Sequence, residues 1–100
     1  MLEAEDHILY VTGTLSGLDI TYLEIEMNKI LADVDNYPKK IVLNCSDLDY
    51  IDDIGIGFLM VVKRKLIQYN KQLVIKRLNP QPKRMFDLLS LNSVFEISYS

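Results

Sequence analysis

The segment Ile41–Cys45 constrains the fold most, because it is apolar with almost no interruption. A strand with one solvent-facing side alternates apolar and polar residues, whereas a short continuous apolar run is typical of a central strand buried on both faces. After an acidic stretch, apolar residues recur at steps of three and four from Ile54 to Leu66, which is the period of a helix. A buried strand followed by a helix predicts an α/β sheet with parallel strands.

The rest of the chain repeats this alternation of strand and helix. The expected elements are a short strand at Leu2–Ala4, a turn at Glu5–His7, a strand at Ile8–Thr12, a loop at Gly13–Gly17, a helix that Asn36–Pro38 ends, strands at Ile41–Cys45, Leu73–Leu78 and Val94–Ser98, and helices from Ile54 and from Asn79–Pro80. The order β-β-α-β-α-β-α-β predicts three helices and a mixed, mostly parallel sheet with an N-terminal antiparallel hairpin. One domain, residues 1–100, is expected.

The helix starts carry recognisable capping residues. Thr21 and Glu24 have the spacing of a capping box, and Asp19 is an alternative cap for the first helix. Asn79 and Pro80 suit the cap and the first position of the last helix. The apolar side of that last helix is expected to consist of Met85, Leu88 and Leu89, with Phe86 flanking it.

Composition excludes several classes of site. One cysteine, Cys45, and one histidine, His7, allow neither a disulfide nor a multi-cysteine or histidine metal cluster within the chain. Cys45 is expected to be a buried, inert thiol. No segment resembles a signal peptide or a membrane span, so a cytoplasmic location without membrane insertion is expected.

Charge is unevenly distributed along the chain. Residues 1–53 contain 3 basic and 12 acidic residues, hence −9, while residues 54–100 contain 8 and 2, hence +6. This split can steer a protein partner or a head-to-tail contact between two copies, which leaves a homodimer open, unless folding intermingles the charges. Nucleic acid is not expected as a partner, because no aromatic residues interleave with the basic ones.

The acidic stretch ends at Asp52 and Asp53, directly before the second helix. Helix starts stabilise acidic groups, so either residue is a candidate cap and a candidate binding residue. Gly55 and Gly57 each cost a helix about 1 kcal/mol relative to alanine. They therefore require either close packing on the chain's own sheet or contact with a partner.

Four pieces of the chain together resemble the STAS family, the sulfate-transporter and anti-sigma-factor-antagonist domains, and especially its free-standing bacterial members. These pieces are Gly13–Leu15, Ile41–Asp47 leading into Tyr50–Gly57, Leu73–Leu78 followed by Asn79–Pro80, and Leu88–Leu91 before Val94–Ile97. In that family the central segment typically has the sequence Asp-Ser-Ser-Gly-Leu-Gly. A kinase-like anti-sigma factor phosphorylates the first serine, which breaks its complex with the domain.

The resemblance places Asp53 at the position of the phosphorylated serine and Asp52 at the family aspartate. Ile54 replaces the second serine, and Gly55 and Gly57 match the two glycines. A carboxylate carries one charge where phosphoserine carries about −1.5 to −2. Asp53 can therefore imitate phosphoserine only in part, or it can serve simply as a helix cap.

The resemblance implies a non-enzymatic, cofactor-free interaction module that switches between partners in transcription regulation, with an anti-sigma factor as partner. The expected docking residues are Asp52, Asp53, Ile54, Gly55 and Gly57, bordered by Thr14 and Ser16, with Thr14, Ser16 and Ser46 as candidate substitute phosphorylation sites.

Two alternatives stay open. The first is an accessory subunit of a bacterial ABC-type lipid transporter, bound to the transporter's ATPase subunit, for which no phosphorylation is needed. The second is a receiver-like phosphoaspartate or magnesium site built from carboxylates, since magnesium prefers oxygen ligands. Its candidate ligands are Asp47, Asp49, Asp52 and Asp53.

Overall fold

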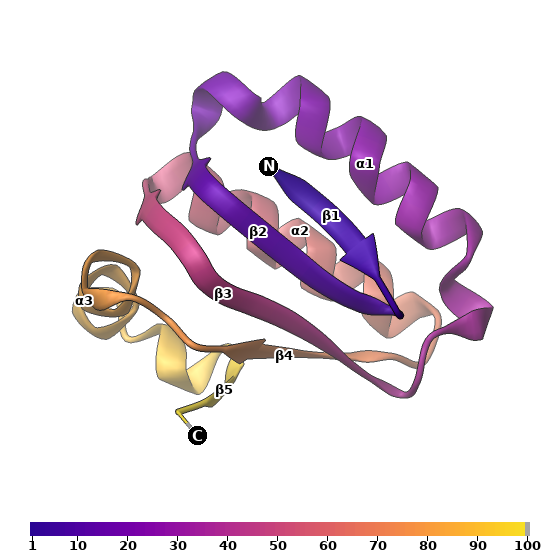
Figure 1. Ribbon diagram of the computed structural model, residues 1–100. Coiled ribbons are helices and arrows are strands. Elements are labelled where there is room, and N and C mark those ends of the chain that lie inside the picture. The colour runs from indigo at the N-terminus through magenta and orange to yellow at the C-terminus, as the bar shows by residue number, and fades with distance from the viewer. Residues whose placement is uncertain (100) are drawn as a thin grey trace.

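The computed structural model, in which residues 1–99 are described, contains one five-stranded sheet in the order β1-β2-β3-β4-β5 (Figure 1). β1 pairs antiparallel with β2, and β2 to β5 are parallel to one another. The strands are β1 (Leu2–Glu5), β2 (Ile8–Leu15), β3 (Lys40–Ile51), β4 (Gln72–Lys76) and β5 (Glu96–Ser98). The helices are α1 (Ile20–Ala32), α2 (Asp53–Gln68) and α3 (Pro80–Leu88), with short 3-10 turns at Gly17–Asp19, Val34–Asn36 and Leu91–Ser93. The predicted fold class, with its N-terminal hairpin and three helices, is confirmed.

The carboxyl ends of β2 and β3 lie side by side, with Leu15 opposite Ile51 in the register. Parallel strands end at the same edge of a sheet, so α1 and α2 both begin there and run next to each other (Figure 1). This edge brings the segments Thr14–Asp19 and Ile51–Gly57 together, although they lie far apart in the sequence.

β3 is much longer than the predicted strand Ile41–Cys45, and it includes most of the acidic stretch that follows that strand. β4 pairs only with its first part, Lys40 to Asn44. Beyond that point the start of α3 covers the edge of β3. Asn79, the cap residue of α3, donates through its Nδ2 to the carbonyls of Ser46 and Leu48, at 2.8 Å each. Side-chain amides therefore satisfy part of the strand edge that β4 leaves open.

Several other boundaries also differ from the predictions. β2 continues through Gly13–Leu15, which was expected to be a loop, because this segment pairs with β3. α1 has Asp19 at the cap position, so the predicted capping box at Thr21 is wrong. β4 ends at Lys76 rather than Leu78, and Arg77 follows with a positive φ of 63°. β5 begins only at Glu96, because the N–H groups of Val94 and Phe95 donate to the Leu91 carbonyl of the preceding 3-10 turn.

The core lies between the sheet and the inner faces of α1 and α2. Leu23, Met27 and Ile30 of α1 and Ile56, Leu59, Val62 and Leu66 of α2 are buried. Cys45 is buried as predicted, and burial raises the pKa of its thiol to about 12. In β3 the expectation of burial on both faces is only partly right, since Ile41, Leu43 and Cys45 are buried but Val42 is half-buried.

The apolar side predicted for α3 is right for Met85, which packs against the core, but wrong for Leu88 and Leu89. Phe86, expected to flank it, is fully buried, whereas Leu88 and Leu89 are 71% and 50% exposed. Among the described helices, none combines the length and apolar composition needed to cross a bilayer.

Because the strands follow one another in sequence order, the two differently charged halves of the chain lie towards opposite edges of the sheet. Among residues 1–99, Lys40–Glu96, at 3.3 Å, is the single ion pair that joins residues 1–53 to the rest. The strands of the two halves therefore lie apart in the sheet, whereas α1 and α2 lie side by side, with Glu24 and Lys65 lining the same groove.

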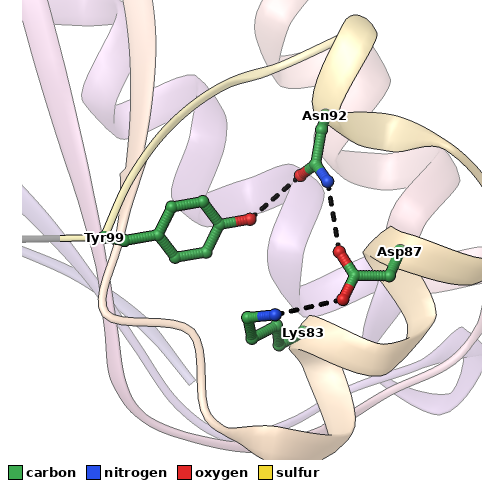
Figure 2. Close-up of polar contacts among 4 residues, drawn as sticks. All are labelled: Lys83, Asp87, Asn92 and Tyr99. Atoms are coloured by element: carbon green, nitrogen blue, oxygen red, sulfur yellow. Dashed lines mark hydrogen bonds and ion pairs between the residues drawn. The ribbon is translucent and has the colours of Figure 1, made fainter.

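A network of four polar side chains connects Tyr99 to α3 (Figure 2). The Asp87 carboxylate accepts hydrogen bonds from Lys83 Nζ and Asn92 Nδ2, each at 3.1 Å. The Tyr99 hydroxyl donates to Asn92 Oδ1, also at 3.1 Å. The hydrogen bond from Asn92, followed by that from Lys83, lowers the pKa of Asp87, and Asp87 raises the pKa of Lys83.

Candidate functional site

Asp52 is the cap of α2. Its Oδ1 accepts a hydrogen bond from the Gly55 N–H at 2.8 Å, and its Oδ2 accepts one from the Gly17 N–H at 3.4 Å. Its own N–H donates to the Leu15 carbonyl at 3.3 Å. Asp52 thus starts the helix and ties it to the turn that follows β2, and its half-buried carboxylate is occupied by these backbone groups.

Asp53 is the first residue of α2 and is exposed. Its Oδ1 lies 3.0 Å from the N–H of the next residue, Ile54. Within residues 1–99 this is the contact that its carboxylate makes. Since Asp52 holds the cap position, the interpretation of Asp53 as a cap is wrong, although a negative charge in the first turn still suits the helix dipole.

Ile54 lies across Gly17 and is 52% exposed. A Cβ placed at Gly17 would be 2.8 Å from Ile54 Cδ1, so the glycine leaves the space that this side chain fills. The neighbouring Leu18 is 98% exposed. Leu18 was not singled out from the sequence. The available signal was its position as an apolar residue between Gly17 and Asp19.

The two glycines of α2, Gly55 and Gly57, have different structural explanations. A Cβ at Gly55 would lie 2.1 Å from the Leu15 carbonyl oxygen, so only glycine allows α2 to approach β2 this closely. Close packing therefore explains Gly55, which is buried. A Cβ at Gly57 would meet nothing within 4 Å, so packing within the described chain does not explain the helix penalty of about 1 kcal/mol at this position.

Asp19 gathers both hydroxyls that were expected to border the site. Its Oδ2 accepts hydrogen bonds from Thr14 Oγ1 at 3.3 Å, from Ser16 Oγ at 3.2 Å and from the Ser16 N–H at 3.2 Å. The sequence suggested Asp19 only as a helix cap. Ser46, the third candidate phosphorylation site, is exposed on β3, outside this cluster.

A groove of about 420 Å³ runs between α1 and α2 and begins at Ile54. The buried side chains of Met27 and Phe58 contribute to its lining. Its remaining lining residues are Ile20, Glu24 and Asn28 on α1 and Gly57, Val61 and Lys65 on α2.

The carboxylates that suggested a magnesium site are not gathered into one. Asp52 binds backbone N–H groups, and Asp47 and Asp49 are exposed on β3. Among residues 1–99, no three His, Cys, Asp or Glu residues lie close enough together to hold a metal ion. The arrangement is thus an exposed acidic and apolar surface at a helix start.

Comparison with known proteins gives the family. A model of the STAS domain matches residues 1–100. The chain belongs to the STAS domain family. BtrV of Bordetella bronchiseptica, a candidate anti-sigma factor antagonist, is 28% identical over 93 residues, which are 93% of this chain and 78% of BtrV.

Solved structures show the same fold. An anti-sigma factor antagonist from Mycobacterium paratuberculosis is 20% identical and matches 100% of this chain and 84% of its own with a TM-score of 0.78. SpoIIAA of Bacillus in its phosphorylated form is 17% identical and matches 100% of this chain and 91% of its own with a TM-score of 0.63. The chain is a STAS domain with homology to anti-sigma factor antagonists.

Proposed function

We propose that the chain is a non-catalytic, cytoplasmic interaction module of the anti-sigma-factor-antagonist type. Its docking surface consists of Leu18, Asp53, Ile54 and Gly57, with Thr14 and Ser16 at the border. Asp52 and Gly55 support this surface from below. The observation that carries the proposal is the division of labour between the two aspartates: Asp52 caps α2, which leaves Asp53 exposed beside an exposed isoleucine.

Protein interfaces typically have an apolar centre and a polar rim. Ile54 and Leu18 are 52% and 98% exposed, so both lose water contact when a partner covers them. Asp53 stands directly before Ile54, in the first turn of α2 and in the field of the helix dipole. A partner that binds here must therefore accommodate one fixed negative charge.

Asp53 offers no hydroxyl to a kinase. In partner switching by phosphorylation, the charge at this position changes; here it is constant. We propose that the partner of this chain accepts an acidic residue at position 53, and that Asp53→Ser converts the constant site into one that a kinase can modify.

The test is affinity capture from a lysate of the native bacterium, with wild type, Asp53→Ser, Asp53→Lys and Asp35→Lys as baits. Asp35→Lys is the matched control, because it reverses an exposed charge in the turn after α1. A kinase-like anti-sigma factor that wild type and Asp35→Lys retain, and Asp53→Lys loses, supports the proposal. Equal capture by all four baits contradicts it.

The same capture separates the transporter alternative, which the absence of a hydroxyl at position 53 favours. Recovery of a transporter ATPase subunit, insensitive to Asp53→Ser, identifies an accessory subunit. The two outcomes differ in the identity of the partner and in the effect of position 53.

A further inference from the structure

We propose that the groove between α1 and α2 seats an amphipathic helical segment of a partner protein, with a row of apolar side chains and basic residues at one end. The proposal deepens the proposed function, since the groove begins at Ile54 of the docking surface. The docking residues alone specify neither the chemistry of the partner segment nor the place on the domain where that segment binds.

The shape of the groove matches a helix. Its α1 wall extends from Ile20 to Asn28 and its α2 wall from Ile54 to Lys65. At 1.5 Å per residue these walls are about 12 Å and about 16 Å long. Such a length corresponds to two to three helical turns, and an amphipathic helix inserts apolar residues into a groove of this kind at steps of three and four.

Gly57 leaves an opening in the α2 wall, about one helical turn after Ile54. Ile54, Val61 and Lys65 each carry a side chain on the α2 wall, whereas Gly57 leaves the wall open, and a Cβ there would meet nothing within 4 Å. The space is therefore available to a side chain of the occupant. This gives a reason for a glycine that packing within residues 1–99 does not explain.

Charge determines which amphipathic helix fits. Glu24 lines the middle of the α1 wall, and the exposed Asp53 stands directly before Ile54 at the start of the α2 wall. Lys65 lies at the other end. A segment with Lys or Arg at the end that approaches Asp53 complements this distribution and is repelled in the reverse orientation.

An acyl chain is a poorer fit than a peptide. A fatty acid brings one negative charge, which can pair with Lys65 but leaves Glu24 and Asp53 without a counter-charge. A basic amphipathic peptide supplies counter-charges to Glu24 and Asp53 and apolar side chains to the lining of the groove.

The test is selection of random phage-displayed peptides of about 12 residues, long enough for three helical turns. The wild-type domain is the target, and Gly57→Phe, which fills the groove, is used for counter-selection. Gly57→Ala is the graded variant, since it adds only a Cβ to the space that the occupant's side chain would fill. The best peptide is then titrated by fluorescence anisotropy against each variant, after circular dichroism has shown that the variants fold.

The expected peptides have apolar residues at steps of three and four and a basic cluster at one end. Their affinity should fall roughly tenfold or more with Gly57→Phe and by a smaller factor with Gly57→Ala. Glu24→Lys should weaken binding as well, whereas Asp35→Lys should not. Glu24→Lys also keeps the proposal testable if Gly57→Phe fails to fold.

Selection of peptides without this pattern, of no peptide at all, or of peptides that bind wild type and Gly57→Phe equally would overturn the proposal. So would binding of oleate that Gly57→Phe abolishes while no peptide competes for the groove. These outcomes are independent of the capture experiment, because a partner that requires Asp53 can be recovered even when the groove is empty.

Discussion

Gln81 forms two hydrogen bonds with the backbone of Ile51: its Oε1 accepts from the Ile51 N–H at 3.0 Å, and its Nε2 donates to the Ile51 carbonyl at 3.1 Å. Ile51 is the last residue of β3 and directly precedes Asp52. On its other side, Ile51 is opposite Leu15 of β2. The segment that leads into the docking surface is thus held between a strand and the amide side chain of α3.

Replacement of Gln81 should loosen this end of β3. Gln81→Ala removes the partners of two part-buried backbone groups, which should cost about 1–3 kcal/mol in urea denaturation and speed hydrogen exchange at the Ile51 amide. Gln81→Glu keeps an acceptor for the Ile51 N–H but loses the donor to the Ile51 carbonyl. Hydrogen exchange at the Ile51 amide in this variant should therefore be intermediate between wild type and Gln81→Ala. Gln68→Ala, at an exposed position of α2, controls for loss of an amide side chain. Unchanged exchange at Ile51 in Gln81→Ala would show that the two hydrogen bonds do not hold this residue.

The two aspartates should respond differently to substitution. Asp52→Ala removes the cap of α2 and the link to Gly17, which should lower the free energy of unfolding by about 1–2 kcal/mol. Asp53→Ala removes a favourable charge from an exposed first turn and should cost only about 0.3–1 kcal/mol. Equilibrium urea denaturation of the two variants measures the difference. A larger loss for Asp53→Ala would contradict the assignment of Asp52 as the cap.

The two glycines form a second matched pair. Gly55→Ala places a methyl group 2.1 Å from the Leu15 carbonyl oxygen, so backbone must move, and overpacking of this kind typically costs about 1–3 kcal/mol. Gly57→Ala meets nothing and improves helix propensity, so it should raise stability by about 0.5–1 kcal/mol. Thermal unfolding compares both with wild type. Stabilisation by Gly55→Ala would mean that α2 and β2 do not approach each other this closely.

The elements of the fold were predictable because their hydrophobic period is local. The run at Ile41–Cys45 and the helical spacing after Ile54 each depend on neighbouring residues, and both elements form. The continuation of β3 to Ile51 was not predictable in this way. Gln81, which satisfies the edge of β3 there, is 30 residues away along the chain, and a local pattern contains no signal for such a contact.

The candidate site was predictable to a different extent. The family resemblance singled out Asp53 and its neighbours, but it did not separate the supporting role of Gly55 from the open position of Gly57. That difference depends on the distance between α2 and the Leu15 carbonyl, which spacing in the sequence does not encode. Leu18 and Asp19 were missed as site residues although their signals are local: Leu18 is an exposed apolar residue in a turn, and Asp19 accepts hydrogen bonds from Thr14 and Ser16, which lie five and three residues away.

The network of Lys83, Asp87, Asn92 and Tyr99 should make stability depend on pH in acid (Figure 2). Hydrogen bonds from Asn92 and Lys83 lower the pKa of Asp87 below its ordinary value of 3.8. A carboxyl whose pKa is lower in the folded state binds protons more readily when unfolded. Its contribution is therefore complete above pH 3.8 and is lost as the pH falls through the lower, folded pKa.

Asp87→Asn should consequently lower the melting temperature at about pH 6, with a difference from wild type that shrinks towards about pH 3. Asparagine cannot carry the charge that pairs with Lys83, so the variant lacks this acid-dependent contribution. Asp35→Asn, which removes an exposed carboxylate outside the network, controls for the change in net charge. Melting curves across this pH range measure the effect, which is small because both side chains are exposed. A difference between wild type and Asp87→Asn that grows as the pH falls would have the wrong sign for a lowered pKa.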